Sequence, residues 1–345
     1  MTPRWTSPLT GSQVFEADAR LVAATLPPGC ASLAILDGPY GIKSGLAWDK
    51  IPRGGTLADL YQGHLDDVGR VCAASASLYL WNTSAGWAEL HPHILARGWT
   101  FRSLIVWDKG PAGCKAIFGA EAITEWPDVT EVCAMYQRHG GELAVVEVLA
   151  GEMEQERIAS GLARATIDTA MGTANVSQYW WQVRNWRLPN EDQWAMLRAL
   201  APGWFRAPWE AMRARERAAR QARAPFNLPV GGTNVWSTGQ VTGPERLKDG
   251  NGDTMHPCQK PLIFAERMIR ASSRPGDLVW APFGSTLREM VAAERMARLD
   301  PAEARKVVTC ELNLDGKDYI GAALEQIGAE VREKAGQLGL FGSAK

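Results

Sequence analysis

Short apolar runs alternate with segments of helical spacing through the first part of the chain. Apolar runs that end in turn or polar residues are typical of buried parallel strands. The segments between them carry apolar side chains at the spacing of an amphipathic helix. This alternation predicts an α/β fold with a doubly wound, mostly parallel sheet and helices on both faces. The predicted strands are residues 32–36, 77–81, 101–107 and 131–136, and the predicted helices are residues 57–74 and 89–97.

The pattern changes in the middle of the chain and resumes near its end. Residues 140–252 are rich in Ala, Arg and Trp and mainly helical in spacing, and their last part, 231–252, is a Gly- and Asn-rich predicted loop. We therefore expect an α/β domain formed by residues 1–139 and 253–345, interrupted by a helical insertion of residues 140–252. The later elements are predicted helices at 262–271 and 287–297 and predicted strands at 277–280 and 307–310.

Composition narrows the class of protein. The 345 residues are 46% hydrophobic, which favours a large globular fold over disorder. No apolar run is long enough for a membrane span and the N-terminus has no signal-peptide layout, so we expect a soluble cytoplasmic protein. The six cysteines are scattered without a C-x-x-C pair, which argues against a zinc ribbon and a disulfide framework.

Charge is uneven along the chain although the formal net charge is only −1. The segment Arg206–Arg223 holds six Arg and two Glu, and Arg213 and Arg217 within it are candidates for contact with a DNA backbone. A solvated helix face is an equally open interpretation of this segment. The acidic stretch at residues 142–156 is interpreted as a solvated face.

Two loops carry candidate chemistry, and the first is Asp37-Gly38-Pro39-Tyr40 after a predicted strand. The Asp37 carboxylate and the Gly38 carbonyl can accept both protons of a planar amine, while Pro39 stiffens the turn and Tyr40 offers a ring for stacking. Holding both protons directs the lone pair of the amine at an electrophile, which suits methyl transfer. By itself the segment is also compatible with an ordinary Gly-Pro turn.

The second loop is Phe283-Gly284-Ser285-Thr286, between a predicted strand and a predicted helix. A glycine in such a turn lets a ligand approach the backbone, and Glu311 follows at the end of the next predicted strand, where a carboxylate can bind ribose hydroxyls. The turn and the later acid together predict a cofactor that contains adenosine.

The order of these motifs resembles the DNA amino-methyltransferases in their permuted (β) arrangement. The catalytic motif comes first, a target-recognition region follows, and the cofactor motif comes last. The resemblance covers nearly the whole chain except the insertion. Five segments carry it, namely Val14-Phe15-Glu16-Ala17-Asp18, Asp37-Gly38-Pro39-Tyr40-Gly41, Trp48-Asp49-Lys50, His256-Pro257-Cys258-Gln259-Lys260-Pro261-Leu262 and Arg274-Pro275-Gly276-Asp277.

The resemblance implies a Rossmann-like methyltransferase fold, S-adenosylmethionine as cofactor, double-stranded DNA as partner and a role in restriction-modification. It places Asp18 and Glu311 at the adenosine part of the cofactor, and Lys260 and His256 near its methionine end. For His256, a helix-entry residue is the alternative. Asp in the first catalytic position favours adenine N6, with cytosine N4 as the runner-up. Methyl transfer needs no metal, so none is expected. Dimers are common in the family, so the resemblance also implies a possible homodimer. The expected location is the cytoplasm of a bacterial or phage-infected cell.

Two departures from the family pattern open a third possibility. Gly38 stands where the family has Pro, which loosens the turn. Ala281 stands where the cofactor motif has an acid, and the turn after it is shorter by a residue or two. A DNA-binding pseudo-methyltransferase or partner subunit without cofactor affinity is therefore a rival hypothesis.

The insertion is the candidate for DNA recognition, because an amine inside a duplex is reached only after base flipping. Residues 166–183 have the look of a helix-turn-helix, in which Asn175, Ser177 and Gln178 would face base edges, and an ordinary helical hairpin is the alternative. The following segment, Trp180–Trp194, contains Arg184 and Arg187 and resembles segments of phage-associated members of the family.

Overall fold

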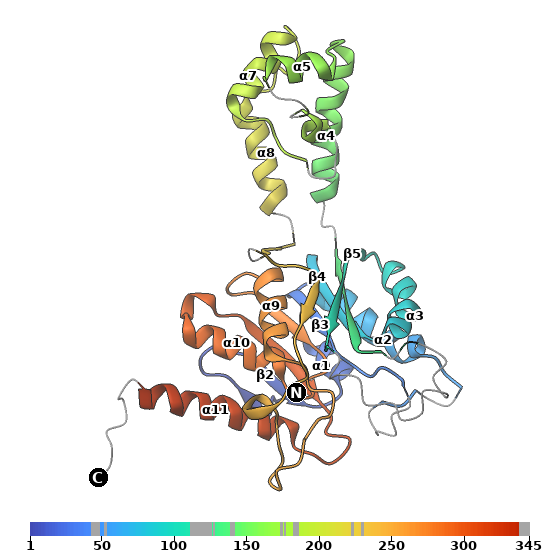
Figure 1. Cartoon of the computed structure of the whole chain (residues 1–345), viewed down its shortest axis with the longest axis vertical. Coiled ribbons are helices and arrows are strands. Elements are labelled where there is room, and N and C mark those ends of the chain that lie inside the picture. The colour runs from blue at the N-terminus through green and yellow to red at the C-terminus, as the bar shows by residue number, and fades with distance from the viewer. Residues whose placement is uncertain are drawn as a thin grey trace. The chain divides into compact units, whose positions relative to one another are not determined.

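The computed structural model places the chain in two compact units, which are described separately. The first unit comprises residues 1–138 and 224–345, and the second comprises residues 139–223 (Figure 1). The structure describes residues 1–42, 49–51, 54–110, 126, 128–138, 142–172, 175, 177–181, 186–221, 224–228 and 231–337. No helix in this described part is both long and apolar enough to cross a membrane.

A single mixed sheet forms the centre of the first unit. Its described strands follow the order β1-β2-β9-β8-β3-β4-β6-β5-β7. Five of the eight pairings are parallel, which confirms the prediction of an α/β fold with a mostly parallel sheet. The strands are β1 (Trp5–Thr6), β2 (Gln13–Glu16), β3 (Ala31–Leu36), β4 (Cys72–Asn82), β5 (Thr100–Asp108), β6 (Thr130–Gln137), β7 (Val235–Ser237), β8 (Leu278–Ala281) and β9 (Lys306–Glu311).

Helices cover both faces of this sheet (Figure 1). Successive side chains of a strand point to opposite faces, so Leu33 and Ile35 of β3 join one apolar core while Ala34 and Leu36 join the other. The first core includes α9, α10 and α11, and the second includes α1, α2 and α3. The layers are those of a doubly wound fold. The helices are α1 (Ala19–Thr25), α2 (Leu57–Val71), α3 (Ser84–Leu95), α9 (Leu262–Ser272), α10 (Arg288–Leu299) and α11 (Tyr319–Gln337).

Two helix ends differ from the sequence prediction for local reasons. The predicted helix at 57–74 ends at Val71, because the chain turns there directly into β4, which begins at Cys72. The predicted helix at 89–97 begins earlier, at Ser84, because the Thr83 hydroxyl accepts a hydrogen bond from the Gly86 N–H and caps the first turn. Strand pairing and capping therefore override the apolar spacing at these ends.

The expected end of the insertion at residue 252 is wrong, because the chain returns to the first unit at Ala224. The stretch 231–252, predicted to be a loop, contains the short strand β7. This strand pairs in parallel with β5, with Val235 opposite Val106. The Trp236 ring lies 5.0 Å from that of Phe264, centroid to centroid, within the first core. A three-residue strand with a single buried side chain leaves no periodic pattern in the sequence.

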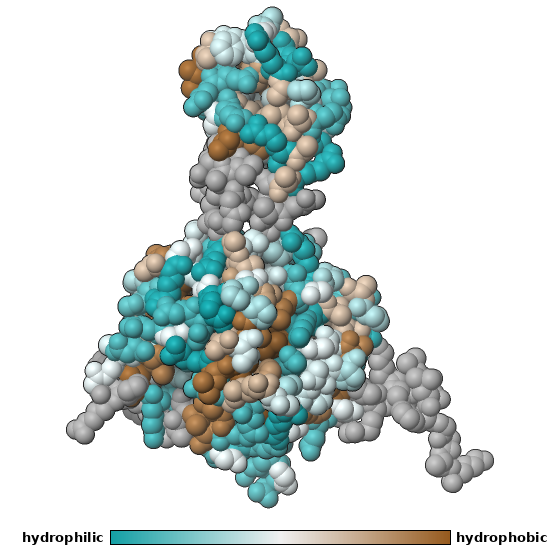
Figure 2. Space-filling model, turned by 180° about the vertical axis from the view of Figure 1, so that it is seen from behind, coloured by the Kyte–Doolittle hydropathy of each residue, from teal (hydrophilic) through white to brown (hydrophobic). Residues whose placement is uncertain are grey.

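The second unit is helical, as predicted, and has an apolar core of its own. Trp180, Trp181, Trp186 and Trp194 are all buried in it. Hydrophilic side chains are spread over the face of this unit that Figure 2 shows, as expected for a unit with its indoles inside. The helices are α4 (Glu142–Ala159), α5 (Arg164–Ala170), α6 (Gln178–Trp181), α7 (Glu191–Leu200) and α8 (Trp209–Gln221).

Candidate active site

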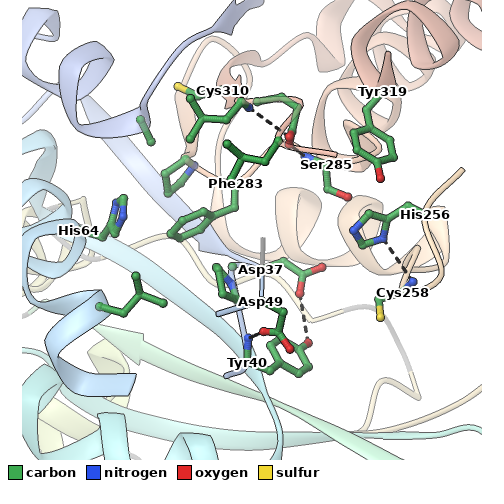
Figure 3. A pocket seen from close by; sticks show the side chains of 18 of the residues that line it. Asp37, Tyr40, Asp49, His64, His256, Cys258, Phe283, Ser285, Cys310 and Tyr319 are labelled. Atoms are coloured by element: carbon green, nitrogen blue, oxygen red, sulfur yellow. Dashed lines mark hydrogen bonds between the residues drawn. The ribbon is translucent and has the colours of Figure 1, made fainter. Parts of the chain in front are cut away.

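The carboxyl ends of four neighbouring parallel strands meet at one edge of the sheet. These strands are β2, β9, β8 and β3, and a cavity of about 380 Å³ lies where their loops converge. Asp18, Asp37, Phe283 and Glu311 line it, each at or just after the end of a different one of these strands. Ligands of open α/β sheets bind beyond the carboxyl ends of the strands, so the cavity is the candidate active site (Figure 3).

The loop that begins at Asp37 is held rigidly. The buried Asp49 carboxylate accepts hydrogen bonds from the Tyr40 and Gly41 N–H groups, both at 2.7 Å. From α2, the Tyr61 hydroxyl donates to the Pro39 carbonyl at 3.1 Å. Three hydrogen bonds therefore fix the turn that presents the Asp37 carboxylate to the cavity, although Gly38 was expected to loosen it.

Gly38 is required by a close approach. A Cβ atom at this position would lie 2.7 Å from the Phe283 ring and 2.6 Å from the Tyr61 hydroxyl. The Phe283 ring lies between His64 and Asp37 in the cavity (Figure 3). The two departures from the family pattern are therefore close in space, because Gly38 lies against the ring of Phe283 in the altered cofactor turn.

Buried charges surround Asp37. The Lys260 ammonium lies 3.0 Å from Asp37 Oδ1, 3.1 Å from Glu131 Oε2 and 2.9 Å from the Tyr40 hydroxyl. Lys109 Nζ lies 2.6 Å from Glu131 Oε1. Two lysines thus balance two carboxylates in a site with little exposure to water, where unpaired charges are costly.

The pKa values in this cluster reflect burial and pairing. Burial raises the pKa of Asp37, an effect that Lys260 opposes. The pKa of Glu131 is lowered to about 2, because the attraction of Lys260 and Lys109 outweighs the effect of burial. The same two carboxylates raise the pKa of Lys260 against its burial. Lys260 and Glu131 are therefore both charged near neutral pH.

Glu131 and Lys109 were not identified from the sequence. Strand β6 is antiparallel to β4, so Glu131 near the start of β6 lies at the edge where β4 ends. A search confined to residues that follow predicted strands omits this position. The pairing of Lys109 with Glu131 follows from the antiparallel register of β5 and β6, which the sequence does not display.

The cofactor-type turn has an unusual backbone. Ser285 and Leu287 both have positive φ, 44° and 51°. The Gly284 N–H donates to the Cys310 carbonyl at 2.6 Å, and a Cβ at Gly284 would lie equally close to that oxygen. The turn is therefore tight, and its glycine is needed to bring it against β9.

Glu311 is bound to this turn and to the chain that follows it. Its carboxylate accepts hydrogen bonds from the N–H groups of Ser285 at 2.6 Å, Leu312 at 3.1 Å and Asn313 at 3.0 Å. Burial raises its pKa against these bonds. Ser285 lines the cavity beside it, whereas Gly284 and Thr286 do not line it. Thr286 is 2% exposed, so its side chain has no access to a cofactor in the cavity, contrary to our expectation.

Asp18 and His256 both line the cavity. Asp18 caps α1, and its Oδ1 accepts the Arg20 N–H at 2.8 Å. Burial and the nearby Lys260 lower the pKa of His256 to about 4, which leaves the ring neutral at neutral pH. Its Nδ1 accepts the Cys258 N–H at 3.2 Å. Helix α9 begins at Leu262, after Pro261, so the structure gives His256 no capping role there.

His64 is a further cavity residue that the sequence analysis did not name. It belongs to α2, and its ring centroid lies 4.8 Å from that of Phe283. Burial lowers the pKa of this histidine. A lone histidine on an amphipathic helix carries no sequence signal for a site, because its neighbour Phe283 is more than two hundred residues away.

In the second unit, the predicted helix-turn-helix lies partly outside the described residues, which leave out 173–174, 176 and 182–185. Among the residues of this segment that the structure describes, α5 has seven residues and α6 has four, so the helix-turn-helix stays a prediction. Ser177 is 1% exposed, and its N–H donates to Asp168 Oδ1 at 3.0 Å. Ser177 is therefore buried in this unit and not available to a base edge. Asn175 is exposed with φ 62°, and Gln178 begins α6.

The basic candidates of the second unit lie on its surface. The guanidinium of Arg187 lies 5.4 Å from the Tyr179 ring centroid, and that of Arg213 lies 5.0 Å from that of Trp209. Arg217 is exposed on α8. Arg215, in the same helix, pairs instead with Glu152 at 2.8 Å. Arg184 lies outside the described residues.

Comparisons with known proteins identify the family of the chain. A family model described as DNA methylase, for N6 and N4 methyltransferases, matches residues 31–334. The type II methyltransferase M.HinfI of Haemophilus influenzae is 33% identical over 101 residues, which are 29% of this chain and 23% of that protein. The matched region thus spans less than a quarter of that relative.

Solved structures of similar fold include a DNA methyltransferase and a protein in complex with SAM. The cytosine-N4-specific PvuII DNA methyltransferase has a TM-score of 0.51 at 12% identity, covering 94% of this chain and 88% of that one. A complex of M1.HpyAVI with SAM has a TM-score of 0.49 at 12% identity, covering 91% of this chain and 98% of that one. The likeness to the PvuII enzyme confirms the expected Rossmann-like methyltransferase fold.

Proposed function

Because the chain belongs to the DNA methylase family, we propose that it transfers a methyl group from S-adenosylmethionine to the exocyclic amine of a base in double-stranded DNA. The observation that carries the proposal is the Asp37 carboxylate, presented by a rigid loop to a cavity that also holds Asp18 and Glu311. An acceptor for an amine and two carboxylates suited to a nucleoside therefore share one cavity.

On the substrate side, the base is flipped out of the duplex so that its amine reaches the cavity. Among the described residues, the hydrogen bonds made to the Asp37 carboxylate come from Tyr40 and Lys260 and go to Oδ1. Oδ2 is left for one proton of the amine, and the Gly38 carbonyl accepts the other. Fixing both protons orients the lone pair toward the methyl group. Asp37 is also the proposed acceptor of the proton that the amine releases after transfer.

On the cofactor side, the residues fit a nucleoside with a charged amino-acid tail. The close packing at Gly284 brings the turn against β9, so that Ser285 and Glu311 lie together in the cavity wall. Glu311 and Asp18 would hold the adenosine part, Phe283 would contact it, and His256 and Lys260 would face the methionine end. When bound, S-adenosylmethionine supplies an electrophilic methyl group, and the chain's own residues orient the amine that receives it.

Adenine N6 is the proposed acceptor, because Asp occupies the first position of the catalytic motif. The motif order supports membership of the permuted class, in which Asp37-Gly38-Pro39-Tyr40 precedes the second unit and the cofactor turn follows it. The phage-like segment Trp180–Trp194 supports a restriction-modification role in a bacterial or phage-infected cell. A cytoplasmic homodimer is the proposed assembly.

The second unit is the proposed site of DNA recognition. Arg187, Arg213 and Arg217 are exposed there, and guanidinium groups of this kind contact phosphates. Asn175 and Gln178 remain candidates for base contacts. We propose no base contact for Ser177, because it is buried.

The test is methyl transfer to a defined DNA. Purified protein is incubated with tritiated S-adenosylmethionine and unmethylated duplex DNA, and the nucleosides are separated after digestion. We expect label in N6-methyladenine and a loss of at least about a hundredfold in Asp37→Ala, because an interaction used in the transition state is removed. Asp66→Ala, at an exposed position of α2 that pairs with Arg97, is the matched control.

Each outcome of this experiment decides between hypotheses. Label in N4-methylcytosine would establish the runner-up specificity instead. The absence of label from every base, together with the absence of cofactor binding in calorimetry, would support the pseudo-methyltransferase hypothesis. Full activity in Asp37→Ala would show that the catalytic assignment is wrong.

A further inference from the structure

Lys260 is shared between two carboxylates in the active site. Its ammonium lies almost equally far from Asp37 Oδ1, at 3.0 Å, and from Glu131 Oε2, at 3.1 Å. The Lys260 side chain is 7% exposed, and that of Glu131 is 15% exposed. In so dry a site a lysine with only one carboxylate would form a close pair with it. Asp37 and Glu131 therefore compete for the same cation.

Lys109 holds Glu131 in place for this competition. Its ammonium lies 2.6 Å from Glu131 Oε1, while Lys260 contacts the other oxygen, Oε2. The Tyr40 hydroxyl contacts both carboxylates, at 3.1 Å from Asp37 Oδ1 and 3.0 Å from Glu131 Oε2. Each oxygen of Glu131 thus has a cationic partner, and its carboxylate is fixed beside the catalytic loop without lining the cavity.

The other titratable groups that face Asp37 have raised pKa values, in contrast to Glu131. Glu289 of α10 has its pKa raised to about 7 by burial, and Tyr61 of α2 has its pKa raised well above the usual range. Cys133 of β6 and Cys258 also have raised pKa values, so both thiols stay neutral. Glu131 is therefore a carboxylate beside Asp37 that stays charged throughout the working pH range.

We propose that Glu131, anchored by Lys109, is a positioning residue that keeps Lys260 from pairing with Asp37 alone and so leaves Asp37 free to accept the target amine. This inference rests on the proposed methyl transfer. Glu131 does not touch the substrate in this scheme. It acts by dividing the charge of Lys260 and by holding the Tyr40 hydroxyl.

Two variants with opposite effects test the inference. In Glu131→Gln the anion is lost, Lys260 pairs with Asp37, and the pKa of Asp37 falls. We expect kcat to fall about 10- to 100-fold with little change in the KM for S-adenosylmethionine, because the amine must displace a cation from its acceptor. The acidic limb of the kcat profile, where Asp37 becomes protonated, moves to lower pH.

In Lys109→Met one cation is lost, and Glu131 draws Lys260 away from Asp37. The pKa of Asp37 then rises, and the acidic limb moves to higher pH. Glu131→Asp, which keeps the charge, should recover most of the kcat that Glu131→Gln loses. Asp66→Asn, at an exposed ion pair of α2, is the control and should leave kcat and the pH profile unchanged.

The measurements are single-turnover and steady-state rates of wild type and variants from pH 5 to 9, with calorimetric binding of S-adenosylmethionine and circular dichroism to confirm folding. Opposite displacements of the acidic limb support the inference. If the acidic limb of the kcat profile is unchanged in both variants, or moves in the same direction in both, the inference is overturned. If Glu131→Gln does not fold, the position of the acidic limb in Lys109→Met decides the question. If the wild type itself transfers no methyl group, the proposed function fails instead, which separates the two cases.

Discussion

At the scale of single residues, the contact of Gly38 with Phe283 links the two unusual motifs of the active site. A Cβ at residue 38 would meet the Phe283 ring at 2.7 Å, so the ring must move or the loop must open. We expect Gly38→Ala to destabilise the protein by about 1–3 kcal/mol, as overpacking does. We also expect weaker binding of S-adenosylmethionine, because Phe283 lines the cavity.

The check is thermal unfolding and calorimetric titration of Gly38→Ala beside Gly239→Ala. A Cβ at Gly239 would meet no atom within 4 Å, so this variant controls for the added methyl group itself. The double variant Gly38→Ala with Phe283→Leu should regain part of the lost stability. Unchanged stability and affinity in Gly38→Ala would show that the two motifs are not coupled.

The residues of the site were predictable to the extent that they follow parallel strands. Asp37 and Glu311 combine an apolar run with a terminal acid, and both line the cavity. Glu131 escaped notice because it starts an antiparallel strand, and His64 because its partner ring is distant in sequence. Thr286 was predicted to bind the cofactor, but its side chain is buried and does not line the cavity, which the motif alone does not show.

At the scale of elements, the start of α2 positions part of the active site. Thr56 and Asp59 form a reciprocal capping box there, and the helix carries Tyr61 to the Pro39 carbonyl. We expect Thr56→Ala to lower the free energy of unfolding by about 1 kcal/mol, because backbone N–H groups lose their cap. Urea unfolding measures this loss.

Thr242→Ala is the matched control, because Thr242 precedes the short 3-10 helix Gly243–Glu245 and its side chain makes no cap hydrogen bond there. Its free energy of unfolding should stay close to that of the wild type. An equal loss in both variants would indicate that the capping box of α2 makes no specific contribution.

The elements themselves followed from apolar spacing where several side chains repeat it. β3 was predicted within a residue of its observed bounds, because its side chains fill two cores in alternation. The sequence did not reveal that β6 runs antiparallel between β4 and β5, since an apolar run has no direction. β7 was missed because one buried Trp in three residues sets no period.

At the scale of the whole molecule, the proposed methyl transfer and the proposed recognition of DNA belong to different units of the chain. The first unit contains the entire sheet and the cavity, while the second has a separate core of buried Trp side chains. Because each unit buries its own apolar residues, neither requires the other's core to fold. Because the first unit resumes at Ala224 and not at residue 253, the segment that can be removed from the chain is residues 139–223.

We expect that replacing residues 139–223 with a flexible Gly/Ser linker leaves the first unit folded and able to bind S-adenosylmethionine, because no residue of the cavity is removed. Affinity for duplex DNA should fall, and with it the salt dependence of binding, because Arg187, Arg213 and Arg217 are lost. Calorimetry with the cofactor and fluorescence anisotropy with DNA at two salt concentrations measure both properties.

A full-length variant with Arg213→Ala and Arg217→Ala should reduce the salt dependence of DNA binding in part. Arg215→Ala should reduce it less, because the Arg215 guanidinium is paired with Glu152. Unaltered DNA affinity in the shortened protein would assign DNA binding to the first unit instead.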